Sequence, residues 1–284
     1  MQRINIGGVP EHFNLPWHLA KENHFFEKEN IDLNWVTCKG GTGQMSEMLA
    51  NQELDMAILL TEGSVKHIID HQKFKIAQVF ISTPLVWGIH TGYDSKIESY
   101  GEIFDQAYAI SCYGSGSHLM AQVDAYFKQK SINKDQWNVI KNLEGALDSF
   151  NSNPDQVFYW EKFTTKPFVD QQKLRRVGEF ITPWPCFVIV ASNELIKNNP
   201  ADIANVLKVI NYTSHQLMEA ENAIDMFIER YNMLPEDAHQ WFHMTEWNTS
   251  PAVTDKMLGN VMQILKDCGV IAQKVNPIDL IAKI

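Results

Sequence analysis

Residues 107–127 read AYAISCYGSGSHLMAQVDAYF, and this stretch decides the fold that we expect for the chain. It begins with an apolar run typical of a short buried strand, turns at GSGS (114–117), and continues over 118–127 with apolar residues at helical spacing. Ser115 or Ser117 is suited to cap that helix. The turn then presents free backbone N–H groups and the positive end of a helix dipole. It therefore either binds an anionic or strongly polar group or simply joins a strand to a helix.

The same order of strand, polar turn and helix recurs before this stretch. We expect strands at 4–6, 31–36, 54–60 and 75–81, and helices at 17–27, 45–51 and after residue 64. Alternating strands and helices predict a mainly parallel sheet with right-handed crossovers. Ligands bind such sheets beyond the carboxyl ends of the strands. The loops at those ends are rich in glycine and polar residues, and they are 7–17, 39–44 and 61–64.

The alternation of strands and helices begins again after residue 90. The chain is nevertheless too short for two complete doubly wound domains followed by several helices. The second series has a helix-like segment at 92–106, strands at 108–113, 139–140, 156–160, 174–177, 180–181 and 186–191, and helices at 143–150, 200–219, 223–232, 235–243 and 253–267. We therefore expect an α/β fold with two lobes, each a mainly parallel sheet flanked by helices, joined by two hinge strands. Residues 1–91 would form the first part of lobe I, 92–184 lobe II, and 185–284 the return strand to lobe I with the C-terminal helices.

The charge and composition of the chain exclude several classes of partner. The 284 residues are 45% hydrophobic, which suffices for a large core, and the net charge is −10 without a basic run. We therefore expect neither nucleic acid nor an anionic membrane surface as a partner. The four cysteines are far apart, and the histidine pairs 67/71 and 239/243 lack a third ligand, so we expect no metal and no cofactor.

The start of the chain bears on its location. No stretch is long and apolar enough to span a membrane, so we expect no transmembrane segment. The chain as given runs from Met1 directly into a strand, without a leader-like apolar segment. We therefore expect a cytoplasmic protein, or a periplasmic or lipid-anchored one if a leader has been removed.

Several segments taken together resemble a known fold. They are AKENHFFEKENIDLNWV (20–36), GGTGQMSEMLANQELDMAILLTEG (40–63), YGSGSHLMAQ (113–122), ALDSFNSNPDQVFYWEKF (146–163) and PCFVIVAS (185–192). Their order and spacing resemble the type II periplasmic (solute) binding protein fold over nearly the whole chain. Within that fold, the chain looks closest to the branch of alkanesulfonate, nitrate and taurine receptors and of NMT1/THI5-like proteins.

The resemblance implies two α/β lobes that hold a ligand in the cleft between them. By this resemblance, the cleft is lined by residues that follow strands in both lobes and by two tryptophans near the hinges. The residues so implied are Glu11, His12, Phe13, Asn14, Gly41, Thr42, Gly43, Thr61, Glu62, Trp87, Ser115, Gly116, Ser117, His118, Trp160, Glu161 and Trp184.

The residue types in this set favour a planar ligand. Its aromatic side chains offer flat apolar faces, and its carboxylates accept hydrogen bonds from amines. A sulfonate or nitrate site would more often contain Arg or Lys, and Lys39 is the only cation near the set. We therefore expect a pyrimidine-like or other planar ligand in preference to a simple oxyanion. Each tryptophan or histidine taken singly is equally typical of core or hinge packing.

Two functions are compatible with the resemblance. The first is a protein that closes its lobes on a small organic ligand, either as the receptor of an ABC importer, with the permease as partner, or as a cytosolic relative. The second is a cytosolic enzyme on the same fold. It would resemble menaquinone-pathway enzymes, with His118 or Glu62 as general base, or thiamine-pyrimidine-precursor synthases. The cysteine-rich iron-binding stretch of those synthases is absent, and no G-x-S-x-G elbow surrounds Ser115 or Ser117, so we favour binding.

Overall fold

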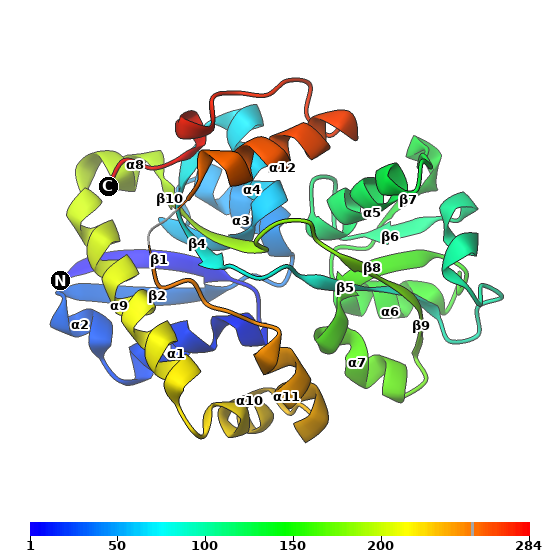
Figure 1. The fold of residues 1–284 in the computed structure, drawn as a ribbon, viewed down its shortest axis with the longest axis horizontal. Coiled ribbons are helices and arrows are strands. Elements are labelled where there is room, and N and C mark those ends of the chain that lie inside the picture. Colours follow the sequence, from blue (N-terminus) through cyan, green and yellow to red (C-terminus); the bar gives the residue numbers. More distant parts are fainter. Residues whose placement is uncertain (251–252) are drawn as a thin grey trace.

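Two five-stranded sheets lie side by side and form the centres of two lobes (Figure 1). The structure is a computed structural model, and it describes residues 1–250 and 253–284. The first sheet has the order β2-β1-β3-β10-β4, with bounds Ile31–Thr37, Gln2–Gly8, Met56–Leu60, Phe187–Ser192 and Phe74–Ile81. The second has the order β7-β6-β8-β5-β9, with bounds Trp137–Val139, Tyr108–Ile110, Val157–Glu161, Val86–Gly92 and Leu174–Ile181.

Each sheet is mainly parallel and contains one reversed strand. In the first sheet β1 pairs in parallel with β2 and β3, whereas β10 runs antiparallel to β3 and β4. In the second, β6 pairs in parallel with β7 and β8, whereas β5 runs antiparallel to β8 and β9. Strands covered on both faces need apolar residues throughout, and every residue of β3 and β10 is buried. The expected two-lobed α/β class is confirmed.

The chain crosses between the lobes twice, at 82–85 and at 182–186. The two crossings are joined by hydrogen bonds from Thr182 N to Leu85 O (3.0 Å) and from Cys186 N to Thr83 O (3.1 Å). The sequence placed the first boundary after residue 91, but β5 lies in the second sheet, so the structure moves that boundary to 82–85. Strand pairing is a long-range property, which an apolar run alone does not specify.

Helices cover both sheets, and those after β10 return to the first lobe (Figure 1). The first lobe has α1 Leu15–Glu22, α2 Phe25–Lys28, α3 Gly41–Ala50 and α4 Thr61–His71, and the second has α5 Gly116–Phe127, α6 Leu143–Phe150 and α7 Lys162–Asp170. The final helices are α8 Asn193–Asn198, α9 Pro200–Glu219, α10 Ala223–Tyr231, α11 Pro235–His243 and α12 Asp255–Asp267. Short 3-10 helices occur at η1 His12–Asn14, η2 Tyr100–Asp105, η3 Lys134–Gln136 and η4 Pro277–Leu280.

Some expected elements differ in extent. The helix expected over 17–27 is two helices, because His24 adopts a left-handed backbone conformation with φ of 55°. The segment 92–106 begins with the last residue of β5 and otherwise has η2 in place of the expected helix, and the strand expected over 108–113 ends at Ile110. Helix α7 was not expected, since its sequence KFTTKPFVD carries an internal proline and two threonines, which have low helix propensity.

The lobes are packed against each other. Helix α5 of the second lobe contacts α3, α4 and α12 of the first. One cluster of buried apolar residues runs through both lobes, and a smaller one lies between α6, α7 and the second sheet. Within residues 1–250 and 253–284, no helix has the length and apolar character needed to cross a membrane.

Candidate functional site

A cavity lies between the two lobes and takes its walls from both. Its volume is ≈ 50 Å³, about a third of the roughly 150 Å³ of an apolar cavity that holds benzene. The structure therefore represents a nearly closed arrangement. The first lobe contributes Val9, Glu11, Gly40, Gly41, Thr42, Met45, Ile58, Leu60 and Phe187, the crossing contributes Leu85, and the second lobe contributes Trp87, Ser111, Ser115, Gly116, Ser117, Trp160 and Glu161.

The turn before α5 brings three small residues to the cavity wall. The Ser117 hydroxyl accepts a hydrogen bond from Ser111 N (3.0 Å), and the Ser115 hydroxyl donates to Cys112 O (2.7 Å). The expected side-chain cap of this helix is wrong: Ser115 occupies the N-cap position but makes no capping hydrogen bond, because its hydroxyl is used within the turn. The first backbone N–H groups of α5 are thus left without a side-chain cap.

Helix α3 presents its N-terminus to the same cavity from the first lobe. Gly40 is its N-cap residue, again without a side-chain cap, and Gly40, Gly41 and Thr42 line the cavity. Gly41 has φ of +68°, a conformation that suits glycine and sharply turns the chain into the helix. The Thr42 hydroxyl accepts from Leu60 N (3.0 Å), which ties this turn to the end of β3.

Two carboxylates, one from each lobe, face the cavity. Glu11 is partly buried, and no described residue donates a hydrogen bond to its carboxylate; Glu161 is 4% exposed and accepts from Thr164 N (2.6 Å). Burial, followed by the nearby charge of Glu161, raises the pKa of Glu11 to about 8. Burial also raises the pKa of Glu161 to about 7. No lysine or arginine is among the residues that line the cavity in the described part of the chain.

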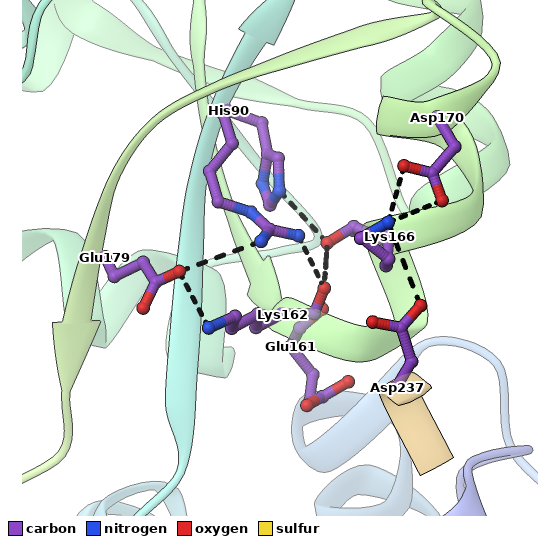
Figure 2. Close-up of polar contacts among 9 residues, drawn as sticks. His90, Glu161, Lys162, Lys166, Asp170, Glu179 and Asp237 are labelled. Atoms are coloured by element: carbon purple, nitrogen blue, oxygen red, sulfur yellow. Dashed lines mark hydrogen bonds and ion pairs between the residues drawn. The ribbon is translucent and has the colours of Figure 1, made fainter. Parts of the chain in front are cut away.

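Two ion pairs bridge the lobes outside the cavity wall. Lys166 of α7 contacts Asp170 in its own helix (2.6 Å) and Asp237 of α11 (3.8 Å), as Figure 2 shows. Lys39 forms a similar bridge to Glu144 of α6 (3.1 Å), with both side chains mostly exposed. The Glu161 carboxylate points away from the network around α7 (Figure 2). The Lys39 pair is mostly exposed and contributes little to stability. The positive charge that acts on Glu161 is that of Arg176, which partly offsets the rise in the pKa of Glu161.

The raised carboxylate pKa values predict that stability falls as pH increases above neutrality. A carboxyl group that holds its proton more tightly when folded stabilises the protein below its unfolded pKa, and that stability is lost as pH rises through the folded pKa. Burial lowers the pKa of five histidines, among them His12 and His90 to about 3, and these oppose the glutamates until pH exceeds their unfolded pKa of 6.5 and they are mostly neutral in both states. Between pH 7 and about 8 the glutamates therefore dominate.

We expect the free energy of unfolding, measured with urea and tryptophan fluorescence, to fall over that interval by up to about 1.4 kcal/mol per pH unit for each glutamate involved. The Glu11→Gln variant should show a weaker dependence of the unfolding free energy on pH, because glutamine does not titrate and the contribution of Glu11 is lost. A profile that is level, or that rises with pH in both proteins, would contradict the pKa assignment of Glu11.

Nine of the residues implied by the sequence line the cavity, and the other eight do not. The nine are Glu11, Gly41, Thr42, Trp87, Ser115, Gly116, Ser117, Trp160 and Glu161. The eight that the structure places elsewhere are His12, Phe13, Asn14, Gly43, Thr61, Glu62, His118 and Trp184. As ligand contacts, all seventeen stay predictions.

Three of the eight lie at the hinge. Thr61 N donates to Cys186 O (3.0 Å) and the Thr61 hydroxyl to Pro185 O (2.5 Å), so Thr61 fixes the returning chain. Trp184 Nε1 donates to Glu62 Oε2 (2.9 Å), while Glu62 Oε1 is buried without a partner. Burial raises the pKa of Glu62 to about 7.

Replacing Trp184 with phenylalanine should destabilise the protein in a pH-dependent way. The variant loses the indole donor to a fully buried carboxylate, which we expect to cost about 1–3 kcal/mol at pH 8. At pH 6 the loss should be smaller, because Glu62 is then mostly protonated. Urea unfolding at both pH values measures the difference, and the double variant with Glu62→Gln serves as control. Equal losses at both pH values would mean that only packing was disturbed.

The remaining five residues serve packing or the local turn. The ring of His12 packs against Trp241 at 4.2 Å between centroids; its Nε2 lies 3.8 Å from Glu161 Oε2, but its lowered pKa keeps it neutral, so this contact is not an ion pair. Phe13 packs on Phe187 (5.0 Å), and Asn14 Nδ2 donates to Val9 O (2.9 Å).

The other two lie near the start of α5. His118 Nδ1 accepts from Gly114 N (3.0 Å), so this imidazole shapes the turn. Gly43 faces Cys112 of the other lobe, whose sulfur lies 2.5 Å from the position of an added Cβ.

Sequence reasoning missed eight residues of the cavity wall. Four of them are apolar strand, crossing or helix residues that carried no signal beyond a buried pattern. Val9 and Gly40 lie inside the loops 7–17 and 39–44 that the sequence singled out, Ser111 precedes the turn at 114–117, and Phe187 begins the apolar strand after the second crossing. The full set is Val9, Gly40, Met45, Ile58, Leu60, Leu85, Ser111 and Phe187.

Comparison with known proteins identifies the fold. A family model described as Ca3427-like PBP (periplasmic binding protein) matches residues 87–180. None of the curated proteins searched matches the chain. Among solved structures, the Candida albicans CA3427 gene product, described as having the generic periplasmic binding protein fold, is 23% identical with a TM-score of 0.90, and the match covers 99% of this chain and 96% of that one.

Two sulfonate-binding proteins are also similar in structure. The alkanesulfonate-binding protein SsuA of Xanthomonas axonopodis pv. citri is 11% identical with a TM-score of 0.76. The aliphatic sulphonate binding protein SsuA of Escherichia coli is 15% identical with a TM-score of 0.73. Each match covers 99% of this chain and 98% of the other. The chain therefore has the type II periplasmic binding protein fold, as its sequence led us to expect.

Proposed function

We propose that the protein binds a small organic ligand in the cavity between its lobes and closes the lobes upon it. The position of the cavity carries this proposal, since Glu11 and the α3 N-terminus come from one lobe and Glu161 and the α5 N-terminus from the other. A ligand that touches both lobes stabilises the closed form by its differential affinity. The two crossings at 82–85 and 182–186 give the hinge about which such closure occurs.

The residues of the cavity support a ligand with N–H groups. Carboxylates accept such hydrogen bonds, and the rings of Trp87, Trp160 and Phe187 offer apolar surface. A pyrimidine-like planar ligand has this chemistry, although the cleft must open further to admit a ring. A small anionic group would lie at the helix N-termini. A lone sulfonate, as named for two of the related structures, or a lone nitrate is less well matched, because no lysine or arginine of the described residues lines the cavity to balance it.

The protein partner that we propose, an ABC permease, follows from the similarity of fold alone. Receptors of this fold pass their ligand to an ABC permease, and we extend that role to this protein, with a cytosolic binding protein as the alternative setting. Genes for a permease and an ATPase next to the gene of this protein would support the importer role. A neighbourhood of purely biosynthetic genes would favour the cytosolic setting.

Native mass spectrometry of the purified protein is the direct test of binding. We expect a bound small molecule that is released on denaturation and identified by its mass. Small-angle X-ray scattering before and after its removal should show a larger radius of gyration for the empty protein, because the lobes open. A protein whose dimensions are the same with and without the ligand would contradict the closure mechanism.

An enzyme on the same fold is the second candidate, and the raised carboxylate pKa values favour it. Groups whose pKa is shifted toward neutrality by burial often act as general acids or bases, and Glu161 has this property in the cavity wall. His118 and Glu62, the bases considered from the sequence, do not reach the cavity. Recovery of the ligand chemically intact after long incubation would exclude turnover, and loss of turnover in Glu161→Gln would support it.

A further inference from the structure

We propose that a groove beside the cavity is a second binding site, which takes a small neutral polyhydroxylated molecule such as a monosaccharide or a cyclic polyol. The groove lies between α7 and the segment 231–237, where α10 joins α11, and its volume is ≈ 400 Å³. It shares no lining residue with the cavity. His12 lines the groove and Glu161 the cavity, and the two side chains lie 3.8 Å apart. A ligand in the groove does not require that the cavity bind anything.

Both lobes form walls of the groove. The second lobe contributes one face of α7, including Phe163, Thr164 and Pro167, and the first lobe contributes His12 and the segment 231–234. The volume is more than twice the roughly 150 Å³ of a cavity that holds benzene, so a six-membered ring fits. An occupant that touches both walls also stabilises the closed arrangement of the lobes.

Three polar atoms of residues in these walls have no hydrogen-bond partner in the described part of the chain. They are Nε2 of His12 and the hydroxyl oxygens of Thr164 and Tyr231, and all three are buried. His12 is 4% exposed, and burial lowers its pKa to about 3, so the ring is neutral at pH 7 and Nε2 either donates or accepts. Buried polar atoms without partners are rare and costly in folded proteins. Because these atoms come from both lobes, a slight separation of the walls exposes them to a ligand in the groove.

The charges at the groove disfavour an anion. Its lining contains the carboxylates of Asp170 and Asp237 and, among the described residues, no lysine or arginine. Lys166 makes two hydrogen bonds of 2.6 Å to Asp170 and lies 3.8 Å from Asp237 (Figure 2), so much of this negative charge is already balanced. The Asp237 side chain is 14% exposed and accepts no hydrogen bond from the described residues. It is therefore available to accept from a ligand.

Hydroxyl groups match this set of partners. A hydroxyl both donates and accepts, as do the side chains of Thr164 and Tyr231, and its hydrogen bond to a carboxylate such as Asp237 is a strong one. Phe163 and Met233 add apolar surface, which suits the C–H groups of a ring. The groove therefore fits a neutral ring that carries several hydroxyls.

Isothermal titration calorimetry with five probes tests this assignment. Glucose and myo-inositol are neutral and polyhydroxylated. Glucuronate adds a negative charge, glucosamine adds a positive charge, and cyclohexanol keeps a six-membered ring with a single hydroxyl. We expect glucose or myo-inositol to bind with a dissociation constant below about 10 mM, and at least about 3-fold more tightly than each of the other three probes.

Variants of the groove separate binding from structure. Thr164→Val and Tyr231→Phe remove hydroxyls that have no partner in the described part of the chain. Each should weaken binding of the neutral probe by about 3- to 10-fold and leave the midpoint of urea unfolding unchanged. Asp237→Asn should also weaken binding, because an amide accepts less strongly than a carboxylate. Tyr212→Phe in α9 and Glu236→Gln, next to Asp237, are exposed controls that should retain full affinity.

Each other outcome overturns the assignment. Absence of binding by glucose and myo-inositol at about 50 mM would reject it. Equal or tighter binding of cyclohexanol would mean that the groove is only an apolar surface, and preference for glucuronate or glucosamine would mean that the ligand is charged. A neutral probe with the same affinity for Thr164→Val, Tyr231→Phe and Asp237→Asn would bind elsewhere on the protein.

Discussion

Replacing Gly116 with alanine is expected to hold the lobes apart and to weaken ligand binding by about 10- to 100-fold. A Cβ added at Gly116 would lie 2.3 Å from Leu60 Cδ1, across the cavity in the first lobe, and 2.7 Å from Trp87 Cη2. Trp87 is fixed by the hydrogen bond from its Nε1 to the Thr182 hydroxyl (2.9 Å), so its ring cannot easily move aside. Overpacking of this kind costs about 1–3 kcal/mol in the closed form.

Small-angle X-ray scattering and native mass spectrometry measure the effect of Gly116→Ala. We expect a larger radius of gyration and loss of the co-purified ligand, with little change in the unfolding of either lobe. Gly259→Ala is a matched control, because a Cβ at this helical position meets no atom within 4 Å. It should leave closure unchanged and stabilise α12 by up to about 1 kcal/mol. A Gly116→Ala protein that closes and retains its ligand would show that Leu60 moves away without penalty.

Replacing Asp124 with alanine is expected to destabilise the second lobe by about 3–5 kcal/mol. The Asp124 carboxylate is fully buried in α5 and accepts hydrogen bonds from Tyr100 OH (2.5 Å) and Tyr159 OH (2.6 Å). It thereby joins α5 to η2 and to β8, the strand that ends at Glu161. Burial and the nearby carboxylate raise the pKa of Tyr159, so the phenol keeps the proton that it donates.

Urea unfolding compares Asp124→Ala with three control variants. Tyr100→Phe and Tyr159→Phe each remove one hydrogen bond and should lose about 1.5–3 kcal/mol. Asp124→Asn keeps one acceptor oxygen and should fall between them and Asp124→Ala. Because α5 carries one wall of the cavity, the alanine variant should also bind ligand more weakly. A loss no larger than that of Tyr100→Phe would mean that the two tyrosines are not held by one shared acceptor.

The sequence by itself determined the class of fold and most of its elements, because these depend on local patterns. The apolar runs of β3 and β10 mark strands buried on both faces, and the glycines at 40–43 and 114–116 mark the turns into α3 and α5. Such features depend on the conformations and burial of a few adjacent residues. The turn at 114–117, from which the fold was predicted, does lie at the cavity between the lobes.

Only the tertiary structure decided which sheet each crossing strand joins and which side chains reach the cavity. Glu11 and His12 are adjacent in the same loop, yet Glu11 lines the cavity, whereas His12 packs against Trp241 of α11. Glu62 follows strand β3, much as Thr42 and Ser115 lie at the starts of α3 and α5. Its carboxylate is nevertheless held at the hinge by Trp184, more than a hundred residues away. Side-chain direction in a loop is set by contacts between segments that are distant in the sequence, and these contacts exist only in the folded structure.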